Sequence, residues 1–364
     1  MRVAMVISSF KPIVGGAERQ LEGMLPHLSK LGVFSTVITR RVSGTKKNED
    51  FDNYKIKRLP AKVPKIGFGI SLAYELIKNR GNYDLIHCHT LNGQAAFLSV
   101  CVGALVGLPV ILKITRSGPG TQLQSYLRTF LGKGLLKILF YGAKKVVAIT
   151  RDVENELILT GLTKSKVISI PNGVEKSSDL LKMNTHSVRV VCVGRLIKRK
   201  RIDLLIQAFK NLPYSYNCEL TIVGDGPCKD DLEKLTKKLL LDEQINFLGQ
   251  VPKEEINDIL LDSEIFVLPS SSEGMSNALL EAMSLGLSVI VADIPANKEI
   301  IEDSKNGLTF SDEKALEECL TRLVKDYSYR RDLGSQAKAT IETKYSFNQV
   351  SRRYRDVYKK LMKI

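Results

Sequence analysis

Short apolar runs rich in β-branched residues alternate along the chain with amphipathic segments of helical length. The runs are apolar throughout, which is typical of strands that are buried on both faces of a parallel sheet. The regular alternation of strand and helix predicts an α/β fold with two doubly wound parallel sheets. The runs predicted as strands are Val3–Ser8, Ser35–Thr39, Leu85–Cys88, Val110–Ile114, Val146–Ile149, Val167–Ile170, Val188–Gly194, Leu220–Gly224, Ile245–Leu248, Ile265–Leu268 and Ser288–Ala292.

The length of the chain predicts two domains, because 364 residues exceed what one ordinary hydrophobic core contains. The break is expected at Pro171-Asn172-Gly173, which a polar stretch from Glu175 to Ser187 follows. We therefore expect one Rossmann-like domain in residues 1–171 and a second in residues 172–345. The tail, residues 346–364, is expected to form one last helix.

The positive charge of the chain lies almost entirely in its first half. Residues 1–180 carry 26 Lys and Arg against 12 Asp and Glu, whereas residues 181–364 carry 28 against 27. A surface of one sign attracts anionic partners such as nucleic acid, anionic lipid or a charged substrate. A generally lysine-rich composition is the alternative, but it should have raised both halves.

One basic segment, Leu123–Lys145, mixes Leu, Phe and Tyr with five cations and no acidic residue. This is the composition of a helix that lies at a membrane interface. The alternative is a helix that packs on the sheet with its lysines exposed.

No apolar run approaches the ~18 residues of a membrane span, and the N-terminal run is too short for a signal peptide. Six cysteines without paired spacing fit a reducing cytoplasm.

Two loops after predicted strands have the chemistry to bind phosphate. Gly15-Gly16 opens a helix that runs to about Leu31, and glycine at a helix start lets phosphate approach free N–H groups. It is not a G-x-G-x-x-G sequence, and no acidic residue closes the next strand, which disfavours a dinucleotide enzyme. In the second half, Arg195 and Lys200 follow a strand and could neutralise a diphosphate, although a charge run is usually a solvated face.

Two glutamates, Glu273 and Glu281, flank the start of a predicted helix for which Ser276 is a natural N-cap. On one helix they would be ~12 Å apart, outside the ~5–10 Å range of a glycosidase pair. We therefore expect separate roles, in which Glu273 meets sugar hydroxyls and Glu281 a ribose diol while the helix start faces phosphate.

His87 and His89 end another predicted strand, and alternation places both on one face. His89 is the candidate for a hydrogen bond to substrate, and His87 is expected to be structural. No metal site is expected, since nothing nearby supplies ligands at the usual spacing. Asp50 and Asp52 imitate a metal-binding Asp-x-Asp but are predicted to lie in an exposed loop.

In combination and in order, these motifs resemble the retaining GT-B glycosyltransferases of family 4 (glycosyl transferases group 1), over essentially the whole chain. The Glu273–Glu281 segment with Gly274 is the most specific part. The other matching motifs are Gly15-Gly16-Ala17-Glu18-Arg19, Pro171-Asn172-Gly173-Val174, Val193-Gly194-Arg195-Leu196 with Lys200, Val223-Gly224-Asp225-Gly226-Pro227 and Phe247-Leu248-Gly249.

The resemblance implies two Rossmann-like domains that face a central cleft, with the final helix crossing back to the first domain. It implies a hexosyltransferase that uses a nucleotide-diphosphate-sugar, UDP favoured over GDP, retains the anomeric configuration and needs no metal or other cofactor. Arg195 and Lys200 would grip the diphosphate, Glu273 the transferred sugar, and His89 would lie on the acceptor side. The donor-binding positions would be Gly15, Gly16, Gly224, Gly249, Val251, Gly274, Met275, Ser276, Asn277 and Glu281.

Two departures from the family concern substrate contacts. Met275-Ser276 replaces the more usual Phe-Pro, which leaves the contacts to the donor sugar open. Thr115-Arg116 stands where many members have Thr-His, and an arginine there suggests an anionic or diphosphate-linked acceptor. With the basic first half, this predicts a lipid-linked or saccharide acceptor in cell-surface polysaccharide or glycolipid biosynthesis, reached from the inner face of the cytoplasmic membrane.

Two other functions were weighed. A nucleotide-sugar epimerase or hydrolase on a similar scaffold would need an acid/base constellation, and none is evident. A basic, non-catalytic membrane or nucleic-acid binding protein would leave the Glu273/Glu281 and Arg195/Lys200 groups unexplained. No nucleic-acid partner is expected, because neither an aromatic-plus-basic platform nor a helix-turn-helix signature is present.

Overall fold

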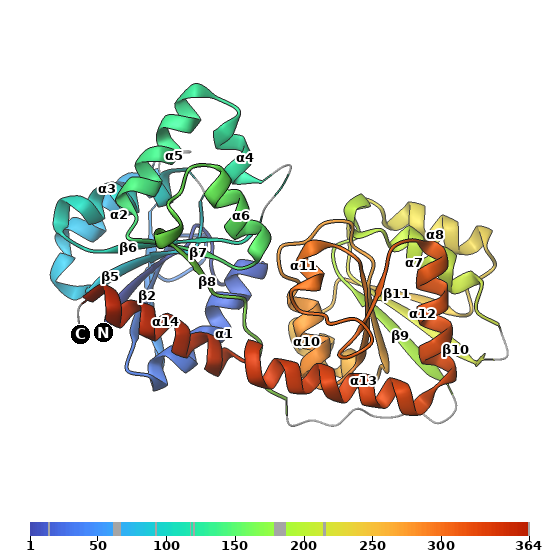
Figure 1. The fold of residues 1–364 in the computed structure, drawn as a ribbon. Coiled ribbons are helices and arrows are strands. Elements are labelled where there is room, and N and C mark those ends of the chain that lie inside the picture. Colours follow the sequence, from blue (N-terminus) through green and yellow to red (C-terminus); the bar gives the residue numbers. More distant parts are fainter. Residues whose placement is uncertain are drawn as a thin grey trace. The chain divides into compact units, whose positions relative to one another are not determined.

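The computed structural model describes residues 1–13, 15–60, 67–91, 93–116, 118, 121–177, 187–213 and 216–362. The chain divides into two compact units, Met1–Gly173 with Phe347–Ile364 and Val174–Ser346. Each unit has its own sheet with helices on both faces (Figure 1), which confirms the predicted pair of doubly wound α/β folds. Most of the polar stretch predicted after the domain break, residues 178–186, lies outside the described residues.

The sheet of the first unit has the strand order β3-β4-β2-β1-β5-β6-β7-β8. All neighbours are parallel except β3 and β4, which form an antiparallel pair at one edge. Since the chain builds outward from β1 in one direction and from β5 in the other, the strand order reverses between these two strands. The strands are β1 (Arg2–Val6), β2 (Phe34–Arg40), β3 (Asn48–Phe51), β4 (Tyr54–Leu59), β5 (Leu85–Cys88), β6 (Val110–Ile114), β7 (Lys145–Ala148) and β8 (Val167–Ser169).

Helices cover both faces of this sheet, and each face has its own apolar core. One core joins the sheet to α2, α3, α5 and α6, and the other joins it to α1 and the final helix, α14. Helix α14 packs beside α1 through buried residues at helical spacing, among them Val350, Tyr354 and Tyr358. The helices are α1 (Gly16–Lys30), α2 (Gly67–Lys78), α3 (Gly93–Val106), α4 (Gln122–Leu127), α5 (Phe130–Gly142), α6 (Arg151–Leu159) and α14 (Phe347–Met362), with short 3-10 helices η1 (Arg80–Asn82) and η2 (Lys164–Lys166).

Two sequence predictions for the first unit are corrected. Asp50, predicted in a loop, is exposed but belongs to the edge strand β3, where it pairs with Lys55 of β4. The single helix expected over Leu123–Lys145 is two helices, α4 and α5, because the Thr129 side chain caps the start of α5. A capping threonine satisfies free N–H groups at a helix start and so favours a new helix there.

The sheet of the second unit is parallel throughout and has the order β11-β10-β9-β12-β13-β14. Its strand order reverses between β9 and β12. The strands are β9 (Val188–Val193), β10 (Cys218–Val223), β11 (Ile245–Gly249), β12 (Ile265–Leu268), β13 (Ser288–Ala292) and β14 (Leu308–Phe310). The helices are α7 (Ile202–Lys210), α8 (Lys229–Lys238), α9 (Lys253–Leu261), α10 (Asn277–Leu285), α11 (Pro295–Lys298), α12 (Glu313–Lys325) and α13 (Tyr327–Thr340), with a 3-10 turn η3 (Lys198–Lys200) and a π-helical turn η5 (Ile341–Tyr345).

The topology points to one position in each unit. In open α/β sheets, ligands bind beyond the carboxyl ends of the strands at the point where the strand order reverses. That point follows β1 and β5 in the first unit, and β9 and β12 in the second. The loops at these two positions hold the residues described next.

Candidate functional site

In the second unit, three strand ends are held together by close backbone contacts. The amide of Gly194 donates to the carbonyl of Val223, 2.9 Å, and that of Gly224 donates to the carbonyl of Gly249, 2.8 Å. Gly224 has φ of +137°, and a Cβ atom built there would lie 1.9 Å from the Gly194 carbonyl oxygen. Only glycine fits, so the loops after β9, β10 and β11 approach each other through bare backbone.

The β9 and β12 loops meet in an ion pair. The Lys200 ammonium in η3 lies 2.5 Å from Oε1 of Glu273, and the two side chains are only 14% and 10% exposed. Glu273 lies in the loop between β12 and α10, at the point where the strand order reverses. The structure therefore brings together two of the residues predicted to serve the donor, at the position where the topology favours a ligand.

A second cation, Arg199, contacts the same carboxylate. Its Nη1 lies 3.6 Å from Oε2 of Glu273 and donates to the carbonyl of Ser272, 2.9 Å. The amide of Ser271 in turn donates to the Arg199 carbonyl, 2.9 Å. The sequence reading placed Arg199 in a basic run but gave it no role. Its pairing became visible only with the fold, because 74 positions separate Arg199 from Glu273 along the chain.

Arg195 lies apart from this cluster. It is exposed directly after β9, and it forms no ion pair within the part of the chain that the structure describes. The structure thus leaves Arg195 available to solvent, whereas Lys200 and Arg199 are held by Glu273. The grip of Arg195 on a diphosphate stays a prediction.

Helix α10 begins beside Glu273 and carries the remaining predicted positions of this loop. The Ser276 hydroxyl accepts a hydrogen bond from the Leu279 amide, 3.3 Å, which confirms Ser276 as the N-cap. Gly274, Met275 and Ser276 are buried. Glu281 is half-buried on α10, five residues after the cap. A capped helix start next to two cations is favourable for a negatively charged ligand.

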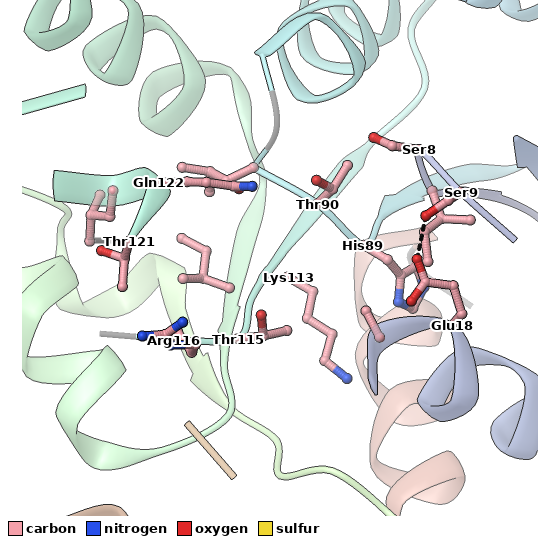
Figure 2. Close-up of a pocket in the computed structure, with 15 residues that line it drawn as sticks. Ser8, Ser9, Glu18, His89, Thr90, Lys113, Thr115, Arg116, Thr121 and Gln122 are labelled. Atoms are coloured by element: carbon pink, nitrogen blue, oxygen red, sulfur yellow. Dashed lines mark hydrogen bonds between the residues drawn. The ribbon is translucent and has the colours of Figure 1, made fainter. Parts of the chain in front are cut away.

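The first unit contains a pocket of about 340 Å³ at the carboxyl ends of β1, β5 and β6, next to its own reversal of strand order (Figure 2). Ser9 and Glu18 form one wall and are joined by a hydrogen bond from the serine hydroxyl to the carboxylate. Arg116 and Gln122 lie on the opposite side in Figure 2, and Lys113 lies between the two groups. Lining residues are Ile7, Ser8, Ser9, Ala17, Glu18, His89, Thr90, Leu91, Lys113, Ile114, Thr115, Arg116, Thr121, Gln122 and Leu123.

The two histidines at the end of β5 differ in their surroundings. Their ring centroids lie 4.0 Å apart, and the ring planes are tilted by 35°. His87 is fully buried, and its Nδ1 hydrogen-bonds the Tyr358 hydroxyl of α14, 2.7 Å. His89 lines the pocket. Burial lowers the pKa of both imidazoles well below the usual value, helped by the Lys113 ammonium at His87 and by His87 and then Lys113 at His89, so both are neutral near pH 7.

Lys113 is a site residue that sequence reasoning missed. Its side chain is 5% exposed, and it donates to Oδ1 of Asn172 at 3.2 Å and lies 5.8 Å from the ring of Tyr354. Burial lowers the pKa of this ammonium to about 8. The available signal was a single lysine in the otherwise apolar run Val110–Ile114, where a buried strand position carries a charge.

Helix α5 has an exposed apolar and basic face. Phe130, Leu131 and Tyr141 are 91%, 83% and 88% exposed. Lys133 and Lys137 are also exposed on this helix. Meanwhile Leu136, Leu139 and Phe140 are buried in the apolar core that α5 shares with α3 and the sheet. Helix α5 therefore buries one side in the apolar core of the first unit and presents large apolar side chains to solvent on another. Its contact with a membrane interface stays a prediction.

The predicted site residues fall into the two units. Gly15, Gly16 and His89 belong to the first unit; Gly15 is the N-cap of α1, and Ala17 and Glu18 of its first turn line the pocket. All the other predicted positions belong to the second unit. Within the described ranges, no group of three or more His, Cys, Asp or Glu is arranged to hold a metal ion. No helix in those ranges has both the length and the hydropathy to cross a membrane.

Comparison with known proteins places these features in a family. Residues 14–178 match the family model described as Glycosyltransferase Family 4, and residues 175–340 match that of Glycosyl transferases group 1. An uncharacterized glycosyltransferase of Methanocaldococcus jannaschii is 24% identical over 390 aligned positions, covering 100% of this chain and 99% of the relative. A sulfoquinovosyl transferase of Arabidopsis thaliana is 24% identical over 80% of this chain and 60% of its own length.

Solved structures share the fold over the whole chain. A sucrose-phosphate synthase of Thermosynechococcus elongatus superposes with a TM-score of 0.80 at 18% identity, covering 100% of this chain and 99% of its own. An Anabaena protein in complex with UDP and glucose has a TM-score of 0.79 at 17% identity, covering 99% and 100%. The two family models together span residues 14–340. The chain belongs to the GT-B glycosyltransferases of family 4.

Proposed function

We propose that this glycosyltransferase moves a hexose from a nucleotide-diphosphate-sugar, UDP-sugar in preference to GDP-sugar, to a lipid-linked or anionic acceptor with retained anomeric configuration. The observation that carries the donor part is the cluster of Lys200, Arg199 and Glu273 beside the N-terminus of α10. Two cations and a helix start are suited to a diphosphate, and a carboxylate is suited to sugar hydroxyls.

In this proposal the donor diphosphate takes the place of Glu273 on Lys200. The freed Glu273 carboxylate then binds hydroxyls of the transferred sugar, while Arg195 reaches the diphosphate from the end of β9. Glu281 binds the ribose diol. Gly224, Gly249 and Val251 lie around the ends of β10 and β11, and backbone groups there would bind the base.

The fixed cations and the helix start stabilise the negative charge of the leaving diphosphate, and we propose that no metal ion is needed for this. Retention follows from the resemblance to family 4, in which the leaving phosphate accepts the proton of the acceptor hydroxyl on the same face. In the first unit, Gly15 and Gly16 would offer amides to the diphosphate, and His89 would hydrogen-bond on the acceptor side.

Relatives support the class of donor and acceptor. The Anabaena structures hold UDP with glucose, or UDP-glucose. A relative in Schizosaccharomyces pombe is the gpi3 subunit of a phosphatidylinositol N-acetylglucosaminyltransferase, 26% identical over 62% of this chain and 50% of its own length. With the sulfoquinovosyl transferase, this favours a glycolipid or a lipid-linked saccharide as product.

We further propose that the first unit docks through α5 on anionic lipid at the inner face of the cytoplasmic membrane. Exposed Phe130, Leu131 and Tyr141 supply apolar area for insertion into the lipid. Residues 101–150 contain Lys and Arg but no acidic residue, so their charge is complementary to that of anionic lipid. Flotation with phosphatidylglycerol vesicles tests this with the double variant Phe130→Ser/Tyr141→Ser. Leu159→Ser, a residue 87% exposed on α6, is the matched control. Equal flotation of both variants, or indifference of the wild type to lipid charge and salt, would contradict docking.

The donor is tested by screening the purified protein against UDP-, GDP- and ADP-sugars without metal, by thermal shift and by donor consumption. We expect one UDP-sugar to bind to the wild type and to Glu233→Ala, a glutamate on α8 whose side chain is 42% exposed, but not to Glu281→Ala. Analysis of the sugar product distinguishes a glycosyltransferase from an epimerase or hydrolase. An epimerase or hydrolase would convert the donor at full rate without an acceptor.

A further inference from the structure

The pocket of the first unit carries a net positive charge. Its charged lining residues are Lys113, Arg116 and Glu18, and the neutral His89 adds no charge. Glu18 is already engaged by the Ser9 hydroxyl on one wall. The lining therefore presents one cation in excess, in a pocket large enough for a group of several atoms.

Lys113 is buried without a carboxylate. Within the described residues it forms no ion pair, and its ammonium has one neutral acceptor, Asn172, and the nearby Tyr354 ring. An ammonium has three donors, and burying it without a counter-charge is costly. A methionine would fill the same strand position without that cost. The lysine therefore indicates an anion that is supplied from outside the chain.

Two further groups facing the pocket have unused nitrogen atoms. Nε2 of His89 and Nε of Arg116 are buried and have no hydrogen-bond partner among the residues described. Buried polar atoms are nearly always paired, so unpaired ones that line a pocket point to a ligand. Figure 2 shows Lys113 between the side chains of His89 and Arg116.

We propose that this pocket binds a negatively charged group of the acceptor, a phosphate or a carboxylate, with Lys113 as its counter-ion and His89 and Arg116 as further donors. Assigning the anion to the acceptor rests on the proposed function, in which the cations that neutralise the donor diphosphate are Lys200 and Arg195 of the other unit. The anion site itself does not depend on it. The class of acceptor is thereby narrowed to phosphate-linked lipids and acidic saccharides.

The experiment uses thermal unfolding of the full chain in sodium phosphate or sodium glucuronate against sodium chloride of equal ionic strength. The variants are Lys113→Met and, as matched control, Lys30→Met, an exposed lysine of α1. We expect phosphate or glucuronate to raise the melting temperature of the wild type and of Lys30→Met. In Lys113→Met the anion concentration for half the effect should rise at least about tenfold, the weakening expected when one charged hydrogen bond is lost.

The melting temperature in chloride separates a binding role from a structural one. Because Lys113 is buried without a counter-charge, Lys113→Met should melt at the same temperature as the wild type or higher. A clear decrease would mean that the lysine stabilises the fold, and an undiminished anion response would show that Lys113 binds no anion. Either result would overturn the proposal.

Binding of UDP to the same variants distinguishes the two sources of phosphate. Unchanged UDP affinity in Lys113→Met, together with a lost phosphate response, supports an acceptor group. Loss of both would assign the anion to the donor and overturn the acceptor assignment. A wild type that binds phosphate through Lys113 but binds no nucleotide-sugar would leave this site standing and contradict only the proposed function.

Discussion

The ion pair between Lys200 and Glu273 predicts that removing the Glu273 charge strengthens the binding of UDP but slows the transfer of the sugar. The substitution Glu273→Gln keeps the shape of the side chain but removes its charge. In the unliganded protein, Glu273 holds Lys200 at 2.5 Å and Arg199 at 3.6 Å. According to the proposal, UDP must displace this carboxylate from Lys200, whereas the sugar of a full donor needs it.

The structure sets the size of both effects. The Lys200 side chain is 14% exposed and that of Glu273 10% exposed. Hydrogen bonds to charged groups contribute about 1.5–3 kcal/mol to stability. Without competition from Glu273, UDP should bind up to about 10- to 100-fold more tightly, since 1.4 kcal/mol is a factor of ten. The lost contact to the sugar should lower kcat/KM for transfer by about the same factor. In the absence of ligand, the variant should be less stable, by about 1–3 kcal/mol, because Lys200 keeps no full counter-charge.

Calorimetric titration with UDP and initial transfer rates with the preferred donor measure the two parts on the same protein. Glu233→Gln on α8 is the control, since the side chain of this glutamate is 42% exposed and lies far along the chain from the site. Weaker UDP binding in Glu273→Gln would refute the reasoning, because it would mean that Glu273 does not compete with phosphate for Lys200. Unchanged transfer would refute its contact with the sugar.

Gly224→Ala should lower the free energy of unfolding in urea by at least about 2 kcal/mol, because the alanine Cβ would meet the Gly194 carbonyl. Gly44→Ala, where φ is +78° but the surrounding space is open, should lower it by less. Ser276→Ala removes the cap of α10 and should cost about 0.5–2 kcal/mol in the same assay, and a neutral result would contradict the cap. Glucuronate, whose carboxylate stays ionised throughout, should bind fully near neutral pH and more weakly as pH rises through about 8, where the Lys113 ammonium loses its proton. Titrations across that range measure this, and a binding curve without a step there would exclude Lys113 as the counter-ion.

Much of the fold could be predicted because most strands are buried on both faces. The bounds of β6, β12 and β13 agree with the predicted runs residue for residue, since the apolar run ends where the strand leaves the core. Strand β4 was missed because it lies near the sheet edge, where Lys55 is exposed between buried Tyr54 and Ile56. Such alternation with lysine reads as a polar connection until a partner strand is known.

The candidate site could be predicted only in part. The residue types at the strand ends were evident, but the sequence contains no distance between Arg199 and Glu273. That pairing depends on β9 and β12 being neighbours in the sheet. Lys113 was missed for a related reason. A lysine within a strand reads as an edge residue, and only the final helix, with Tyr354 packed over it, shows that the position is buried.

The central claim is that the cations at the β9 end of the second sheet hold the donor diphosphate. Its most direct test is calorimetric titration of UDP-glucose, or the UDP-sugar found by the screen, into the wild type, Lys200→Met and the exposed control Lys210→Met of α7. We predict that Lys200→Met binds about 10- to 100-fold more weakly while Lys210→Met binds as the wild type does. Equal affinity of all three proteins would contradict the account.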